Sequence, residues 1–149
     1  MRREEHEEPV YEAGAHQVAV GEDAGSAEWF GPYHLILESV GGKLLGYAMD
    51  MLAPGGTCVT FGSSGEAETS FDARSFYLTG GARLYGFILF HEVLTHPASD
   101  GLARLSRLVA EGRLAPLVSV EAPWEEVGEV AQRLLDRGYT GKAVLSVVS

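Results

Sequence analysis

Two short runs of Gly and Ser follow two apolar segments of this sequence. The first run, residues 39–42, follows Tyr33–Glu38, and the second, residues 62–65, follows Thr57–Phe61. Apolar segments of this length between turn residues are typical of buried strands in a parallel sheet. Ligands bind beyond the carboxyl ends of such strands, where glycines let them approach the backbone. A tight turn or a solvent loop needs the same residues for geometry alone, so both interpretations stand.

A helix must join these two strands, and the residues between them have a helical pattern. From Lys43 to Leu52, apolar side chains recur at one-face spacing: Leu44, Leu45, Ala48, Met49 and Leu52. Pro54-Gly55-Gly56 ends the helix, because Pro presets φ and Gly supplies a positive φ in a turn. Strand, helix and strand in this order predict a parallel βαβ unit.

The remaining segments alternate in the same way. Further strands are predicted at residues 17–20, 83–90, 116–120 and 140–148, and helices from Ser99 or Asp100 to Gly112 and from Trp124 to Gly138. Residues 21–31 and 63–80 are predicted to be irregular, the former with a helical turn at 27–30. Residues 1–9 are either a frayed tail or the start of a helix that ends at Gly14. This alternation indicates an α/β fold with a largely parallel sheet.

The composition disfavours several classes of function. A net charge of −10 disfavours nucleic acids and anionic membranes, because phosphate neutralisation requires clustered Lys and Arg. The charged residues 1–8 lack the apolar core of a signal peptide, and no apolar run is long enough to cross a membrane. The single cysteine, Cys58, allows no intrachain disulfide, which favours a reducing cytoplasm. The 149 residues correspond to one domain.

Side chains that could perform catalysis are scattered. The five histidines are His6, His16, His34, His91 and His96. None has a strong metal-ligand spacing, so no metal site is expected. Ser39, Ser63 and Ser64 do not lie in a G-x-S-x-G motif, which disfavours serine hydrolysis. Glu38, the one acid inside a predicted buried strand, either lines a ligand cleft or is satisfied at the strand end. The sequence singles out no catalytic side chain, so the catalytic residue is unknown from the sequence.

Several motifs, in a fixed order, carry a resemblance to a known superfamily. They are Gly14–Val18 (GAHQV), Tyr33–Gly42 (YHLILESVGG), Leu52–Thr57 (LAPGGT), Phe61–Gly62 and Gly141–Leu145 (GKAVL). In this order they resemble the C-terminal part of the medium-chain dehydrogenase/reductase superfamily, and especially its zinc-free quinone oxidoreductase branch. The resemblance covers nearly everything from Glu12 to Ser149.

The resemblance implies a partial Rossmann-type parallel sheet with flanking helices. Residues 12–115 would be the C-terminal half of a dinucleotide-binding domain, and residues 116–149 the C-terminal strands of a missing catalytic domain. Residues 1–11 match poorly and would be a disordered or frayed tail. The family's G-x-G-x-x-G fingerprint, which binds the pyrophosphate, does not occur in the sequence. The chain is therefore expected to be a truncated member.

The resemblance also implies which residues face the cofactor, NADP or NAD. They are Ser39, Val40, Gly41, Gly62, Ser63, Ser64, Gly86, Phe87 and Lys142. The strand-end residues would border the nicotinamide and its ribose, and Gly86 and Phe87 its carboxamide. The alternatives are turn geometry, a packing or dimer contact at Gly86, and a solvated Lys142.

The function that the resemblance implies is hydride transfer from NADPH or NADH to a quinone, an enone or a similar acceptor. The cofactor would carry the chemistry, without a metal, and the chain would contribute backbone contacts. The alternative is a catalytically silent truncated remnant, or a half-domain subunit that needs another chain, because half a sheet leaves an edge exposed. Residues 83–90 form the most apolar predicted strand and are expected to pair edge to edge in a homodimer.

Overall fold

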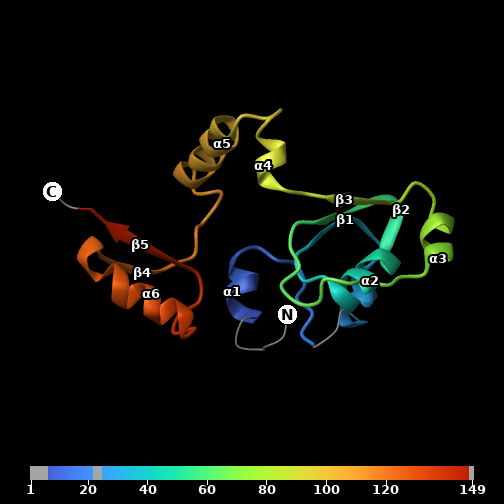
Figure 1. Cartoon of the computed structure of the whole chain (residues 1–149), viewed down its shortest axis with the longest axis horizontal. Coiled ribbons are helices and arrows are strands. Elements are labelled where there is room, and N and C mark those ends of the chain that lie inside the picture. The colour runs from blue at the N-terminus through green and yellow to red at the C-terminus, as the bar shows by residue number, and fades with distance from the viewer. Residues whose placement is uncertain (1–6, 22–24, 148–149) are drawn as a thin grey trace. The chain divides into compact units, whose positions relative to one another are not determined.

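The structure is a computed structural model that describes residues 7–21 and 25–147. The chain divides into two compact units, residues 1–97 and 98–149. Both units combine parallel strands with helices (Figure 1), which confirms the predicted α/β class.

The first unit is built around a three-stranded parallel sheet with the strand order β1-β2-β3. Its elements are α1 (Glu7–Glu12), the 3-10 helix η2 (Gly25–Phe30), β1 (Tyr33–Glu38), α2 (Gly42–Asp50), β2 (Leu52–Thr60), α3 (Ala73–Leu78), β3 (Arg83–Gly86) and α4 (Leu89–Glu92). Helix α2 joins the parallel strands β1 and β2, which confirms the predicted βαβ unit.

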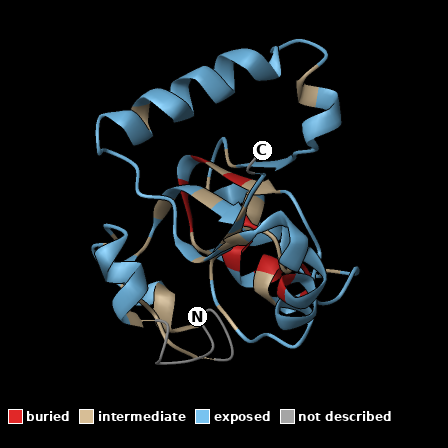
Figure 2. Ribbon diagram, turned by 90° about the vertical axis from the view of Figure 1, so that its left-hand side faces the viewer, coloured by how far each residue is buried: buried red, intermediate tan, exposed pale blue. Residues whose placement is uncertain are grey.

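Helix α2 packs its apolar residues against the sheet. The core consists of Leu45, Ala48, Met49, Leu52 and Cys58, with Ile36, Phe76 and Ala82 packed against it. The register places Ile36 of β1 opposite Cys58 of β2, so both strands contribute to this core. Figure 2 shows the buried residues gathered in α2 and in the strands beside it. Because β1 ends at Glu38 and α2 begins at Gly42, the start of α2 lies at the carboxyl end of β1.

Three predicted segments of the first unit differ from the structure. Helix α2 ends at Asp50, and the turn predicted at Pro54-Gly55-Gly56 lies inside β2, which begins at Leu52. Residues 17–20 are not assigned as a strand, and the described sheet of the first unit consists of β1, β2 and β3. A strand forms only where consecutive residues join a ladder with a neighbouring strand, and residues 17–20 belong to none of the described ladders. Strand β3 ends at Gly86 rather than at residue 90, because its partner β2 ends at Thr60, opposite Gly86. Phe87 and Ile88 lie in neither a strand nor a helix, and α4 begins at Leu89.

The segment predicted to be irregular at residues 63–80 contains helix α3. Asp72 caps this helix, since its carboxylate accepts the N–H groups of Arg74 at 2.8 Å and Ser75 at 3.2 Å. Phe71 and Phe76 pack edge to face with ring centroids 5.6 Å apart. Six residues are too few to show a helical period, although an Asp before a helix is a known start signal.

The second unit contains two parallel strands joined by a helix. Its elements are α5 (Ala98–Ala110), β4 (Val118–Pro123), the 3-10 helix η3 (Trp124–Glu126), α6 (Val127–Leu135) and β5 (Lys142–Ser146). The predicted helices are present, and Gly112 follows α5 with φ 66°. Both predicted strands are present with shifted ends. Ser99 and Asp100 lie inside α5 rather than before it, because the helix begins at Ala98.

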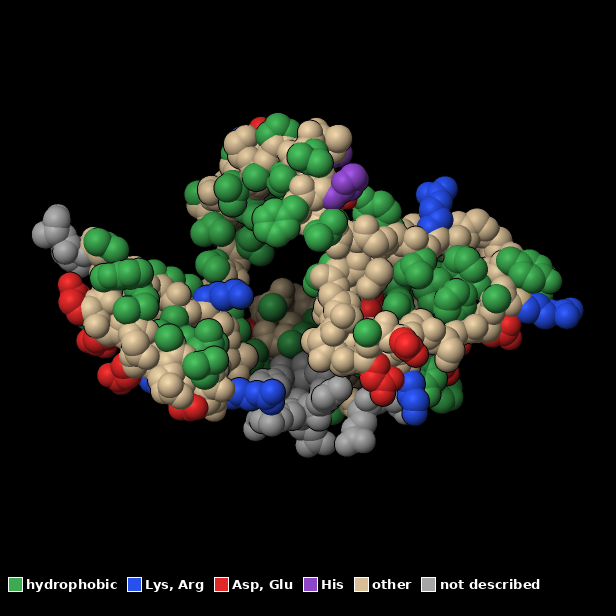
Figure 3. All heavy atoms as spheres, in the orientation of Figure 1, with side chains coloured by type: hydrophobic (Ala, Val, Ile, Leu, Met, Phe, Trp, Pro, Cys, Tyr) green, Lys and Arg blue, Asp and Glu red, His purple; other side chains and the backbone are tan. Residues whose placement is uncertain are grey.

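Helix α5 carries an apolar face that the second unit leaves exposed. Leu102, Leu105 and Val109 are 63%, 50% and 43% exposed. Figure 3 shows hydrophobic side chains on the surface of this helix. The helix therefore has the amphipathic pattern that the sequence predicts, without a covering neighbour among the described residues of its own unit.

The start of the described chain is the helix α1, which ends before Gly14, a residue with φ 99°. This agrees with the helix-end alternative for this segment. Of the tail predicted at residues 1–11, residues 7–11 are helical, and residues 1–6 lie outside the described residues. No helix in the described part of the chain is long and apolar enough to span a bilayer.

Candidate functional site

The side chain of Glu38 closes the carboxyl end of β1. Its Oε1 accepts the backbone N–H groups of Val40 at 2.6 Å and of Gly41 at 2.9 Å. Glu38 is only 7% exposed, and its Oε2 is buried without a hydrogen-bond partner among the described residues. Gly41 precedes α2 with φ 78°, a conformation that favours glycine. Glu38 is therefore a strand-end carboxylate that orders the entry into α2, with one acceptor atom left over.

Backbone hydrogen bonds tie the two Gly and Ser runs together. The N–H of Ser64 donates to the carbonyl of Ser39 at 3.1 Å, and the N–H of Gly65 donates to the carbonyl of Val40 at 2.8 Å. At Gly62, a Cβ would lie 3.1 Å from the carbonyl oxygen of Ser39, so this glycine permits a close approach of the two turns. The runs that follow β1 and β2 are thus neighbours, as a parallel sheet predicts.

Strand β3 brings Gly86 and Phe87 to the same edge of the sheet. Gly86 pairs with Thr60, and the N–H of Phe87 donates to the Thr60 carbonyl at 2.8 Å. A Cβ at Gly86 would meet no described atom within 4 Å, so the backbone is open there. All predicted cofactor contacts except Lys142 therefore lie at the strand ends of the first unit. Lys142 begins β5 of the second unit, where its N–H donates to the carbonyl of Leu117 at 2.8 Å.

Residues 63–70, here called the strap, fill the space beside Gly41 and Gly42. A Cβ on Gly41 would collide with the carbonyl oxygen of Glu66, and one on Gly42 would lie 2.9 Å from the Cβ of Glu66. A cavity of about 200 Å³ remains here, lined by Val40, Gly41, Gly42, Lys43, Leu44, Gly65 and Glu66. Pockets for small molecules usually measure about 300–1,000 Å³. The cavity is thus too small for a whole dinucleotide.

Cys58 is the buried thiol of β2, opposite Ile36 of β1. Burial, and to a smaller extent the negative charge of Glu38, raises the pKa of this thiol from 9.0 to about 11. The thiolate is the nucleophilic form of cysteine. Cys58 is therefore a packing residue at neutral pH and not a nucleophile.

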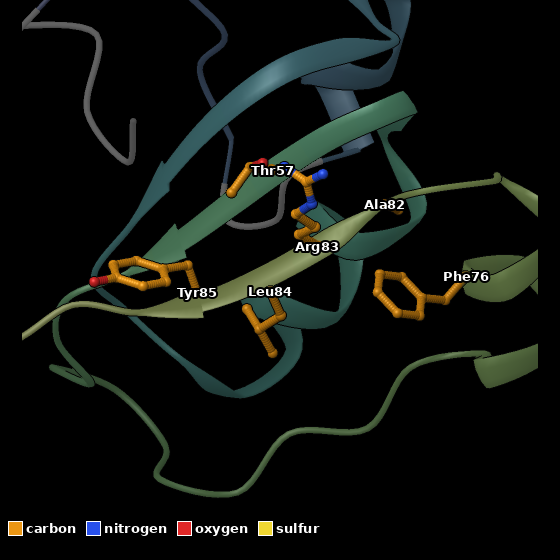
Figure 4. Close-up of a pocket in the computed structure, with 6 residues that line it drawn as sticks. All are labelled: Thr57, Phe76, Ala82, Arg83, Leu84 and Tyr85. Atoms are coloured by element: carbon orange, nitrogen blue, oxygen red, sulfur yellow. The ribbon is translucent and has the colours of Figure 1, made fainter.

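A hollow of about 590 Å³ borders strand β3. It is lined by Thr57, Phe76, Ala82, Arg83, Leu84 and Tyr85. Figure 4 shows Arg83 and Tyr85 leaving one side of β3 and Leu84 leaving the other. The hydroxyl of Tyr85 donates to the carboxylate of Glu92, which links β3 to α4 and raises the pKa of Tyr85. All residues of β3 are exposed, so the edge that the predicted homodimer would use is open.

Sequence reasoning missed two features of the first unit. A cavity of about 760 Å³ is lined by Val10, Ala15, His16, Gln17, Val18, Ala19, Ala27, Phe30 and Tyr33, which come from segments that only the tertiary structure brings together. The packing of the strap on α2 was also missed. Gly46 in the interior of α2 was an available signal, since glycine disfavours a helix interior and needs a packing reason.

Comparison with known proteins places these features in context. A family model described as zinc-binding dehydrogenase matches residues 13–145. No curated protein matches the chain. Similar solved structures include a mycobacterial quinone oxidoreductase, with 22% identity and a TM-score of 0.82, covering 99% of this chain and 47% of that one.

Two further structures carry a cofactor. A mycobacterial protein complexed with NADPH has 22% identity and a TM-score of 0.73, covering 99% of this chain and 48% of that one. A Bacillus subtilis protein with NAD bound has 19% identity and a TM-score of 0.70, covering 97% of this chain and 45% of that one. The chain thus spans less than half the length of each of these structures, and at these identities the likeness establishes the fold alone.

Proposed function

This chain belongs to the zinc-binding dehydrogenase family, and from that premise we propose that it forms the nicotinamide-side part of the cofactor site of an NAD(P)H-dependent oxidoreductase. Membership rests on the match over residues 13–145 and confirms the resemblance to the medium-chain dehydrogenase/reductase superfamily. Within this family, we propose a reductase that acts on quinones, enones or similar acceptors. The cofactor is NADP or NAD.

The observation that carries this proposal is the meeting of three strand ends at one edge of the sheet. The exposed residues Gly62, Ser63 and Ser64 lie beside the turn that follows β1, and the backbone at Gly86 is open. These groups fit half of a dinucleotide, because they offer hydroxyls and accessible backbone.

These groups suit a protein that orients the cofactor, while the cofactor itself performs the chemistry. The bound cofactor supplies the hydride, whereas the protein orients the ring and excludes competing reactions. We assign orientation of the nicotinamide ribose to Ser39 and Val40, and contact with the ring side to Gly62, Ser63 and Ser64. The contact predicted at Gly41 is left out of this assignment, because its backbone is buried beneath Glu66. Gly86 and Phe87 contact the carboxamide. A cofactor contact of Lys142 remains a prediction from the family resemblance.

A second candidate is a catalytically silent half-domain, or a subunit that functions only with another chain. Leu35 and Leu37 of β1 are 60% and 67% exposed, and β1 pairs only with β2 in the described sheet. An exposed strand edge of this kind needs a cover or a partner. This candidate predicts that a dinucleotide binds firmly only after a second chain has covered β1.

The proposal assigns no role to zinc, although the description of the family includes it. In residues 7–21 and 25–147, no group of three or more His, Cys, Asp or Glu side chains could hold a metal ion. The residues that are described therefore do not fit a zinc centre. We also propose a cytoplasmic location, because Cys58 is a free thiol and reducing compartments keep thiols free.

The test uses reduced nicotinamide mononucleotide, which lacks the adenosine half of the cofactor. In an NMR titration of the full chain, it should shift the amide signals of Ser39, Gly62, Ser63, Ser64 and Gly86. NADPH and NADH should shift the same signals without saturable micromolar binding, because the sequence has no pyrophosphate fingerprint. AMP, which carries only the adenosine side, is the control and should leave them unchanged. Shifts confined to other residues would overturn the proposal.

A further inference from the structure

The strap, residues 63–70, lacks the buried apolar side chains that hold the neighbouring α2 and β2 in place. Its sequence, SSGEAETS, contains no large apolar side chain, and every residue in it is exposed except Thr69, which is half-buried. Regions with few buried apolar contacts open with a lower free energy than the core of the same protein. The strap therefore differs from α2 and β2, whose apolar side chains form the core.

Polar and backbone contacts fasten the strap to α2. The hydroxyl of Thr69 donates to the carbonyl of Gly42, the first residue of the helix. In the middle of α2, a Cβ on Gly46 would lie 2.5 Å from the carbonyl oxygen of Ser70. Glycine in a helix interior lowers stability by about 1 kcal/mol relative to alanine. Contact with the strap accounts for Gly46, which the helix alone does not need.

The fastened strap also arranges the proposed site. The N–H groups of Ser64 and Gly65 donate to the carbonyls of Ser39 and Val40, so the start of the strap lies on the turn after β1. Glu66 then covers Gly41, which is buried although it has no side chain. When the strap is in place, the exposed Ser63 and Ser64 lie beside Ser39, and the backbone of Gly41 is shielded.

We propose that the strap is a lid that opens as one unit while the βαβ unit stays folded. This inference rests on the proposed function and deepens it. The open lid exposes the backbone at Gly41 and Gly42, and the closed lid presents Ser63 and Ser64 to the ligand. A ligand that contacts the closed arrangement raises its population. Thr69 and Gly46 are positioning residues, because they hold the closed lid without touching the ligand.

Hydrogen–deuterium exchange of the full chain, followed by mass spectrometry, tests the lid. In the wild-type chain, strap peptides should exchange faster than β2 peptides but slower than an unstructured chain. Thr69→Val and Gly46→Ala should each speed up strap exchange by about tenfold and leave β2 exchange unchanged, because they weaken the fastening alone. If Gly46→Ala does not fold, Thr69→Val, which keeps the side-chain shape, decides the question.

Two control variants match these changes. Thr79→Val removes a similar bond, since the Thr79 hydroxyl donates to the carbonyl of Ser75 at 3.0 Å outside the strap. Gly128→Ala adds a methyl group inside α6, where a Cβ would meet no described atom within 4 Å. Neither should change strap exchange. Either of two results would overturn the lid proposal. One is a wild-type strap that exchanges at the rate of β2, and the other is a Thr69→Val variant whose strap exchange is unchanged.

Adding reduced nicotinamide mononucleotide separates the lid from the proposed function. It should slow strap exchange in the wild-type chain, and should slow it less in Thr69→Val. If the variants change strap exchange as expected but the mononucleotide has no effect, the lid stands and the proposed cofactor site fails.

Discussion

The carboxylate of Glu38 accepts the N–H of Gly41 at 2.9 Å, so an acid at the end of β1 fixes the entry into α2. Gly41 is the N-cap of α2 and offers no side chain to accept the free N–H groups of the first turn. Glu38 instead satisfies the N–H groups that lead into the helix, and its negative charge suits the positive end of the helix dipole. The proposed site thus depends on a buried carboxylate.

Replacing Glu38 by Ala should lower the free energy of unfolding by about 2–4 kcal/mol, because the N–H groups of Val40 and Gly41 lose their acceptor. Glu38→Gln should have a smaller effect, since its amide oxygen can still accept. Urea denaturation followed by circular dichroism measures both. Glu121→Ala, an exposed acid in β4, is the control and should change the free energy by less than about 0.5 kcal/mol. Equal losses at the two positions would contradict this role.

Stability should decrease with rising pH between about pH 9 and about pH 11 because of Cys58. Below the unfolded value of 9.0, both states hold the thiol proton, and the contribution is constant. Above it, the unfolded chain releases the proton while the folded chain retains it, which favours unfolding. The loss should reach about 1–3 kcal/mol.

Urea denaturation at a series of pH values, compared with Cys58→Ala, measures this loss. The variant should be less stable at neutral pH, because Cys58 is buried in the core, but its free energy of unfolding should fall less steeply above pH 9.0. The comparison of slopes removes the contributions of tyrosine and lysine, which both chains share. Identical slopes would show that Cys58 does not titrate in this range.

The apolar edge at residues 83–90 should mediate self-association. Phe90 is 80% exposed and Ile88 59% exposed, next to the open strand β3. Phe90→Lys should weaken self-association by about tenfold or more, since exposed aromatic residues carry much of the energy of an interface. Leu135→Lys, at a residue of α6 that is 77% exposed, is the matched control and should have no effect. Light scattering over a range of concentrations measures self-association. A wild-type chain that stays monomeric at high concentration would contradict the prediction.

Much of the fold could be predicted because it depends on local patterns. Two apolar segments, at 33–38 and 57–61, predict β1 and β2, and the one-face spacing between them predicts α2. The structure confirms the order of these elements and the parallel pairing of the strands. The same logic failed at residues 87–90, whose apolar side chains predict a strand. A strand needs a paired backbone as well as apolar side chains, and β2 ends opposite Gly86.

The position of the predicted site residues at neighbouring strand ends could be predicted, but the way the chain covers them could not. Their order along the chain places Ser39 and Ser64 at strand ends, and the parallel sheet makes these ends neighbours. The strap has no periodic pattern, so its position on α2 follows from contacts of Gly42 and Gly46 with residues more than twenty positions away along the chain. The only sign of such contacts in the sequence is Gly46, a glycine inside a helix that the local pattern does not explain.

The sequence by itself determined the α/β class, the first βαβ unit and the family, because hydrophobic period, turn residues and motif order are local properties of the chain. Only the tertiary structure decided that Glu38 orders the entry into α2, that Glu66 fills the space beside Gly41 and that β3 stops at Gly86. These depend on which backbone groups and side chains meet after folding. A glycine left free for a ligand and a glycine covered by the chain itself look the same in a sequence.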